Sequence, residues 1–294
     1  MRHAERLGAS LYIPASHPKL SAIANGRDLP GLRSMIMCTE DSVSERDLSQ
    51  SLENLRQTLA SIDKFTPSLR FVRVRNERVL NEVLAMPGVE NLDGFVLPKI
   101  TRENIDRYVS AISHTEHDIM PTLETREVFC DEEMRLLRQK LSEPQIKSRI
   151  LALRIGGNDL LSLLGVRRPR HVTIYRTPLG AVIARLVTTF RPHGFHLTAP
   201  VFEHIDLPQL LADEVAEDML HGLVGKSSIH PEQVALIEGH YRVQPGDVEA
   251  AMKILDTESS AVFKMGGSMC EVATHTNWAR NIMTRRNSFG QLDS

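Results

Sequence analysis

The run Ser34-Met-Ile-Met-Cys-Thr-Glu40 decides the fold, because it is short, largely apolar and ends in a charged residue. An apolar run without polar alternation is typical of a strand buried on both faces of a parallel sheet. A helix is predicted next, since Ser44-Glu-Arg-Asp47 resembles a capping box and leucine then recurs at positions 48, 52, 55 and 59. Strand and helix together form one β–α unit.

This unit recurs along the chain. Short apolar runs, each followed by a polar, helix-like stretch, occupy residues 11–15, 34–40, 70–76, 94–100, 118–124, 150–156, 195–202 and 223–230. Eight such units within about 240 residues predict an α/β protein with a (β/α)8 TIM barrel. The alternative is a doubly wound sheet. That fold usually has a glycine-rich turn after its first strand, where this chain has Pro14-Ala-Ser-His-Pro18.

Two further amphipathic stretches follow the last predicted strand. They lie near residues 245–255 and 275–285, and both have helical spacing. We therefore expect a barrel domain over residues 1–240 and a C-terminal helical extension over residues 241–294.

Composition excludes several classes of protein. The chain has 294 residues, with 35 Lys+Arg against 37 Asp+Glu, so it lacks the basic excess that non-specific nucleic-acid binding requires. Its three cysteines show no zinc-ligand spacing, which favours a reduced compartment. It has no apolar run of about 18 residues, and Met1-Arg-His-Ala-Glu5 lacks a signal-peptide core. We expect a cytoplasmic protein that binds neither nucleic acid nor membrane.

Polar residues gather at the C-terminal ends of the predicted strands, where a barrel builds its active site. They are Thr39-Glu40-Asp41, Arg73 with Arg75 and Asn76, Pro98-Lys99, Glu124, Gly156-Gly-Asn-Asp159, and Lys226 with His230. Six of eight strand ends contribute, which favours one functional rim over scattered surface charge.

Glu124 and Asp159 follow neighbouring strands, so their carboxylates are candidates for a shared Mg²⁺ site. Gly156 and Gly157 would let backbone amides approach a substrate carboxylate. The structural alternatives are that Asp159 caps the helix after it, and that Glu124 pairs with Arg126 or Arg154.

Three cations are candidates for binding an anionic substrate. Arg73 and Arg75 lie two residues apart and share a face of their strand. Lys99 is a further cation for the substrate, an ion-pair partner of Glu40, or a Schiff-base lysine. A metal site makes the Schiff-base role less necessary.

Seven segments in this order resemble the citrate lyase β-subunit-like group of the HpcH/HpaI aldolase family. They are Leu11-Tyr-Ile-Pro14, Glu40-Asp-Ser-Val43, Arg73-Val74, Leu97-Pro-Lys99, Pro121-Thr-Leu-Glu124, Gly156-Gly-Asn-Asp-Leu160 and Gly225-Lys-Ser-Ser-Ile-His-Pro231. The resemblance runs from residue 11 to about residue 233, and more weakly to about residue 283.

The resemblance implies a barrel of the phosphoenolpyruvate/pyruvate-binding type. It implies Mg²⁺-dependent cleavage or formation of a carbon–carbon bond beside a carboxylate, in 2-oxo acids or CoA thioesters. By position, Glu124 and Asp159 would hold the metal, Arg73 would bind the oxo-acid carboxylate, and Glu40 and Asp41 would organise the water and metal shell. It also implies a homo-oligomer, either a trimer or a hexamer.

Three departures separate this chain from the family pattern. Cys38 stands where the family has the first Asp of Asp-Leu-Glu-Asp-Ala-Val, and Arg75 interrupts the usual Arg-Val-Asn. The C-terminal Gly-x-Met-Ile-Asp motif of the CoA lyases has as its best match Gly267-Ser-Met-Cys-Glu271, which offers Glu instead of Asp.

We therefore expect a metal-dependent lyase or aldolase with Arg73, Glu40, Asp41 and Lys99 as its catalytic candidates. Arg73, Arg75, Gly156, Gly157 and Glu124 are its candidates for substrate binding. One alternative is a CoA-independent aldolase that joins pyruvate to an aldehyde in a biosynthetic pathway. The other is a non-catalytic barrel subunit with a binding or assembly role.

Overall fold

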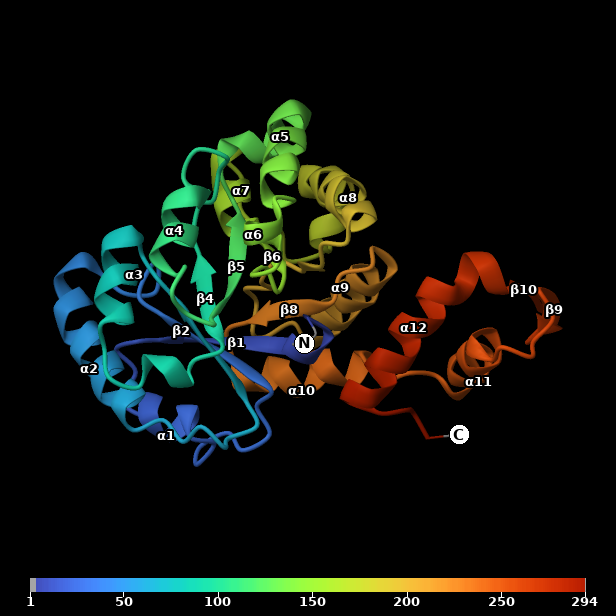
Figure 1. The fold of residues 1–294 in the computed structure, drawn as a ribbon, viewed down its shortest axis with the longest axis horizontal. Coiled ribbons are helices and arrows are strands. Elements are labelled where there is room, and N and C mark those ends of the chain that lie inside the picture. Colours follow the sequence, from blue (N-terminus) through green and yellow to red (C-terminus); the bar gives the residue numbers. More distant parts are fainter. Residues whose placement is uncertain (1–3, 294) are drawn as a thin grey trace. The chain divides into compact units, whose positions relative to one another are not determined.

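A computed structural model describes residues 4–293, and its main feature is an eight-stranded parallel sheet in the order β7-β6-β5-β4-β3-β2-β1-β8. An isolated parallel bridge between Ala199 and Lys226 joins β7 to β8, so the sheet closes into a barrel surrounded by helices (Figure 1). The strands are β1 Gly8–Pro14, β2 Ser34–Cys38, β3 Leu69–Arg73, β4 Gly94–Leu97, β5 Asp118–Leu123, β6 Leu153–Ile155, β7 Leu197–Thr198 and β8 Gly225–Ser228. The predicted TIM barrel is confirmed.

Helices alternate with the barrel strands and continue after β8. They are α1 Leu20–Ala24, α2 Leu48–Ala60, α3 Glu77–Leu84, α4 Ile105–Ala111, α5 Asp131–Leu141, α6 Pro144–Lys147, α7 Gly157–Leu163, α8 Pro178–Phe190, α9 Pro208–Leu220, α10 Pro231–His240, α11 Pro245–Leu255 and α12 Val272–Phe289. None of the helices within residues 4–293 is long and apolar enough to cross a membrane.

The barrel interior has its own small core, separate from the larger core between strands and helices. Ile36, Phe71, Val96 and Met120 belong to it and are fully buried. Alternate residues of a strand share a face, so Cys38, which follows Ile36 by two positions, faces the interior nearer the C-terminal end. The barrel is therefore apolar at its base, and the layers above it carry the polar side chains.

Two predicted strands are shorter than their apolar runs. β6 covers Leu153–Ile155 of the run 150–156, and β7 covers only Leu197–Thr198 of the run 195–202. Their neighbours Ile150 and Ala199 pair only as isolated bridges. The apolar run correctly indicates buried residues here, but the hydrogen-bonded strand is shorter than the buried run.

The capping box predicted before α2 does not form. A 3-10 turn, Glu45–Asp47, precedes the helix, and the hydroxyl of Ser44 donates to the Asp47 carboxylate instead of accepting from a helical amide. The two side chains satisfy each other, so the amides of the first turn have no side-chain cap.

Residues beyond Val234 form a second compact unit, which begins at Ala235. In it, α11 and α12 pack through a small core that includes Val248, Ile254 and Ile282. The two predicted helices are present, but an antiparallel hairpin of β9 Val262–Met265 and β10 Ser268–Glu271 was not predicted. Its turn is Gly266-Gly267, both with positive φ, which is the signal that predicts a hairpin.

Candidate active site

A cavity of about 210 Å³ lies in the barrel unit and is lined mainly by residues in the last layers and C-terminal ends of the strands. Six of the predicted site residues line it: Asp41, Arg73, Glu124, Gly156, Gly157 and Asp159. Polar side chains that the sequence analysis did not select line it as well, among them Tyr12, Cys38, Thr122, Arg154 and Ser227. The signal for these five is strand alternation, since each lies on the inward-facing side of a short strand.

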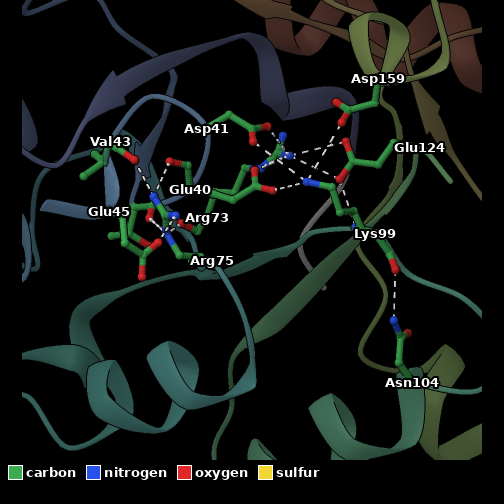
Figure 2. A network of polar contacts seen from close by, with 11 residues as sticks. Glu40, Asp41, Val43, Glu45, Arg73, Arg75, Lys99, Asn104, Glu124 and Asp159 are labelled. Atoms are coloured by element: carbon green, nitrogen blue, oxygen red, sulfur yellow. Dashed lines mark hydrogen bonds and ion pairs between the residues drawn. The ribbon is translucent and has the colours of Figure 1, made fainter. Parts of the chain in front are cut away.

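Arg73, at the end of β3, is the centre of an acidic cluster (Figure 2). One of its terminal nitrogens contacts Glu40, lies 3.3 Å from Asp41 Oδ2 and lies 3.2 Å from Glu124 Oε1. Burial by itself lowers the pKa of Arg73, but Tyr12 and the carboxylates raise it above its ordinary value. Arg73 is therefore a permanent cation whose charge is already shared among three acids.

Lys99 follows β4 in a strained conformation, with a φ of 51°. A non-glycine residue with positive φ is uncommon and needs surrounding contacts to hold it. The backbone N–H of Lys99 donates to Glu124 at 2.9 Å, and its carbonyl accepts from Asn104 at 2.9 Å. The strained backbone therefore positions the carboxylate of Glu124.

The Lys99 ammonium forms the ion pair with Glu40 that the sequence allowed, at 2.6 Å, and lies 3.9 Å from Asp159 Oδ1. Burial lowers the pKa of Lys99, but Glu40 and Asp41 outweigh this and raise it. A Schiff-base lysine must lose its proton to attack a carbonyl. The surroundings of Lys99 therefore favour the ion-pair role.

Glu124, directly after β5, is 2% exposed. Its pKa is raised from 4.5 to about 7, because burial, together with Asp159 and Glu40, outweighs the lowering by Arg73 and by the Lys99 amide. Asp159 lies in the first turn of α7 and does not cap it. Nor does Glu124 pair with Arg126 or Arg154, which contact Glu127 and Ser227 respectively. The two carboxylates lie beside one cavity, as the strand order suggested.

The two glycines before Asp159 have a packing role. A Cβ on Gly156 would lie 2.3 Å from Glu124 Oε2, and a Cβ on Gly157 would lie 2.7 Å from Pro200 Cβ. Both positions therefore require glycine so that Glu124 and α7 can approach, whatever their amides bind.

Arg75 and Lys226 lie away from the cavity lining, contrary to the single rim we expected. Arg75 lies beyond the end of β3 and donates to the carbonyls of Thr39, Glu40 and Val43, so it fastens the loop after β2 (Figure 2). Lys226 lies within β8, and its ammonium contacts two acidic side chains of α9. Strand alternation turns Lys226 outward and its neighbour Ser227 inward.

The raised pKa of Glu124 predicts a pH-dependent stability. A carboxyl whose pKa rises from 4.5 to about 7 on folding stabilises the fold below pH 4.5, and that contribution is lost as pH rises through about 7. Glu124→Gln, which stays neutral, should therefore exceed the parent in free energy of unfolding by up to about 3 kcal/mol at pH 8, with a correspondingly higher thermal midpoint, and by much less at pH 5. Differential scanning calorimetry in EDTA measures this. An equal difference at both pH values would contradict the assignment.

Comparison with known proteins identifies the family and supports the fold. Residues 1–291 match the family described as C–C bond lyases of the TIM-barrel fold. No curated protein matches the chain. Among solved structures, CitE from Mycobacterium tuberculosis in complex with magnesium, acetoacetate and coenzyme A has a TM-score of 0.70 and 20% identity, covering 96% of this chain and 99% of that one.

Two further structures share the fold. RipC from Yersinia pestis has a TM-score of 0.59 and 18% identity, covering 80% of this chain and 95% of its own. Malate synthase from Haloferax volcanii, as a lead(II) complex, has a TM-score of 0.64 and 14% identity, covering 78% of this chain and 71% of its own. These likenesses agree in fold with the citrate lyase β-like resemblance, and the family match spans nearly the whole sequence. The chain is thus a member of the C–C bond lyase family of the TIM-barrel fold.

Proposed function

We propose that this protein is a Mg²⁺-dependent lyase or aldolase that acts on a small oxo- or hydroxy-carboxylate, free or as its CoA thioester. The observation that carries the proposal is the pair of carboxylates, Glu124 and Asp159, on neighbouring strand ends beside one cavity that also holds Arg73. The family supplies the reaction class, and the cavity supplies the residues for it.

The residues fit a magnesium ion. Within residues 4–293 no group of three or more His, Cys, Asp or Glu side chains is arranged to hold a metal. A metal here would therefore take two carboxylates from the protein, leaving further positions to water and substrate oxygens, which is the coordination that Mg²⁺ prefers. The effect of Asp159 on the pKa of Glu124 supports this, because a cation between the two would relieve their repulsion.

The relatives support the same chemistry. The M. tuberculosis proteins bind magnesium together with oxaloacetate in one complex and with pyruvate in another. A bound Mg²⁺ would supply Lewis-acid chemistry, which stabilises negative charge that develops beside a carboxylate. In this chain, Glu124 and Asp159 would hold it.

The protein's own residues prepare the site for negative charge. Arg73 presents a permanent cation at the cavity wall, which stabilises charge that develops on the substrate. Glu40 and Asp41 hold Arg73 and Lys99 in place. Because Glu124 must be ionised to bind a cation, metal affinity should rise as pH increases through about 7.

Product analysis tests the proposal. The protein is incubated with Mg²⁺ and malyl-CoA or citramalyl-CoA, and in parallel with pyruvate and mixed aldehydes, and the products are identified by mass spectrometry. We expect Mg²⁺-dependent cleavage or joining that EDTA abolishes. Conversion of the CoA thioesters alone favours a CoA lyase, and conversion of pyruvate alone favours the CoA-independent aldolase. Equal turnover in EDTA would remove the metal mechanism.

A further inference from the structure

Arg154, in the middle of β6, is a buried cation whose hydrogen-bond partners are neutral side chains. It is 2% exposed, and its guanidinium lies 5.5 Å from the centre of the Tyr12 ring. One terminal nitrogen donates to Ser227 Oγ at 2.8 Å, and the other lies 3.7 Å from Met120 Sδ. Within residues 4–293, no ion pair joins it to a carboxylate.

This arrangement differs from that of the other arginine in the cavity. Arg73 contacts three carboxylates, whereas the partners of the Arg154 guanidinium are the neutral side chains of Ser227 and Met120. A buried charge is costly unless it is paired, and folded proteins rarely retain one without a partner. Of the five N–H donors of the Arg154 guanidinium, two have an acceptor in the protein.

A second buried polar atom lies beside it. Thr122 pairs in register with Arg154, so both side chains face the barrel interior, and both line the cavity. In the part of the chain that the structure describes, the buried hydroxyl of Thr122 has no hydrogen-bond partner. A buried cation and an unpaired hydroxyl on neighbouring strands form a site that an oxyanion would satisfy.

We propose that Arg154 and Thr122 bind a second carboxylate of the substrate, so that the enzyme selects dicarboxylates over monocarboxylates. This inference rests on the proposed function, because it assigns the cavity to the substrate. The metal-side carboxylates and Arg73 then engage one end of the substrate near the mouth of the barrel. Arg154 and Thr122 engage the other end, next to the apolar base that Met120 closes.

Matched ligand pairs test the proposal. Malate and 2-hydroxybutyrate differ only in a terminal carboxylate against a methyl group, as do 2-oxoglutarate and 2-oxovalerate. Calorimetric titration in Mg²⁺ gives a dissociation constant for each. We expect the parent to bind the diacid of at least one pair about 10- to 100-fold more tightly. Arg154→Met should reduce this ratio to about one and leave the monoacid affinity within about threefold. Arg154→Lys should retain part of the preference.

Other outcomes have distinct meanings. No preference in the parent for either pair, no binding of any of the four probes, or an unchanged ratio in Arg154→Met would overturn the proposal. If the parent selects diacids but no substrate undergoes Mg²⁺-dependent carbon–carbon cleavage, the proposed function fails and the dicarboxylate site stands. If cleavage occurs without discrimination, the reverse holds.

Thermal unfolding separates a binding role from a structural one. Removing a buried charge that has no acidic partner should leave the melting temperature of Arg154→Met equal to or above that of the parent. In the parent, malate should raise the melting temperature more than 2-hydroxybutyrate at the same concentration, and Arg154→Met should abolish that difference. If Arg154→Met fails to fold, Arg154→Lys carries the same comparison of ratios.

Discussion

Glu124→Gln is expected to lower the rate of carbon–carbon cleavage by about 1,000-fold, since Lewis-acid stabilisation is worth several kcal/mol and each 1.36 kcal/mol is tenfold in rate. Glutamine keeps the shape that fits against Gly156 but removes the ionisable ligand. Magnesium affinity should fall with it, because a neutral amide replaces one of two protein carboxylates. Asp159→Asn should have an effect in the same direction.

Magnesium titration by calorimetry and initial-rate measurements test this together. The matched control is Glu127→Gln, a carboxylate three residues along the chain that pairs with Arg126 and does not line the cavity. It should leave both the rate and the metal affinity unchanged. Parent-like magnesium affinity and rate in Glu124→Gln would contradict the assignment of Glu124 as a ligand.

The barrel could be predicted from the sequence because a parallel sheet covered on both faces requires strands that are apolar throughout. Strands such as Ser34–Cys38 are buried on both faces, so their apolar character is continuous and visible. The approach of Glu124 to Asp159 followed from strand order alone, since β5 and β6 are neighbours in the sheet.

Side-chain direction limited the rest of the prediction. Arg75 is close in sequence to the cavity-lining Arg73 but lies past the end of β3. There its guanidinium donates to backbone carbonyls of the loop after β2. Lys226 carries a charge near a strand end, yet it packs against α9 while Ser227 lines the cavity. Which partner a charged side chain contacts depends on how loops and helices pack around the strand, and strand patterns do not specify that packing.

Arg154 shows what a single sequence conceals. A lone arginine between Leu153 and Ile155 in a buried strand is unusual, and the sequence alone suggests no role for it beyond pairing with Glu124. In the structure that carboxylate contacts Arg73, and among residues 4–293 no carboxylate pairs with Arg154. The competition between two arginines for one acid is a tertiary property.

Lys226→Met is expected to cause the largest loss of stability, about 3–5 kcal/mol, because it removes one of the cations that neutralise two buried carboxylates. The Lys226 ammonium lies 2.9 Å from Glu214 and 2.8 Å from Asp218, and all three side chains are at most 1% exposed. Arg168 also pairs with Glu214, so the variant would hold two acids and one cation in the interior. For a domain of this size the melting temperature should fall by on the order of 10 °C.

Calorimetry with two companion variants identifies the cause of that loss. Arg135→Met breaks an exposed pair with Glu132 and should change stability by less than about 0.5 kcal/mol. Lys226→Met combined with Asp218→Asn restores one acid to one cation. The amide oxygen introduced by Asp218→Asn would still accept from Tyr175, whose hydroxyl lies 2.6 Å from Asp218. The double variant should therefore recover part of the stability.

Low pH independently tests whether the loss of stability is electrostatic. The loss in Lys226→Met should shrink as pH falls, because burial raises the pKa of Asp218 and the carboxyl becomes neutral there. If neither Asp218→Asn nor low pH relieves the loss, the loss comes from the packing of the lysine stem. Only an electrostatic cause would couple Lys226 to the ionisation of its partners.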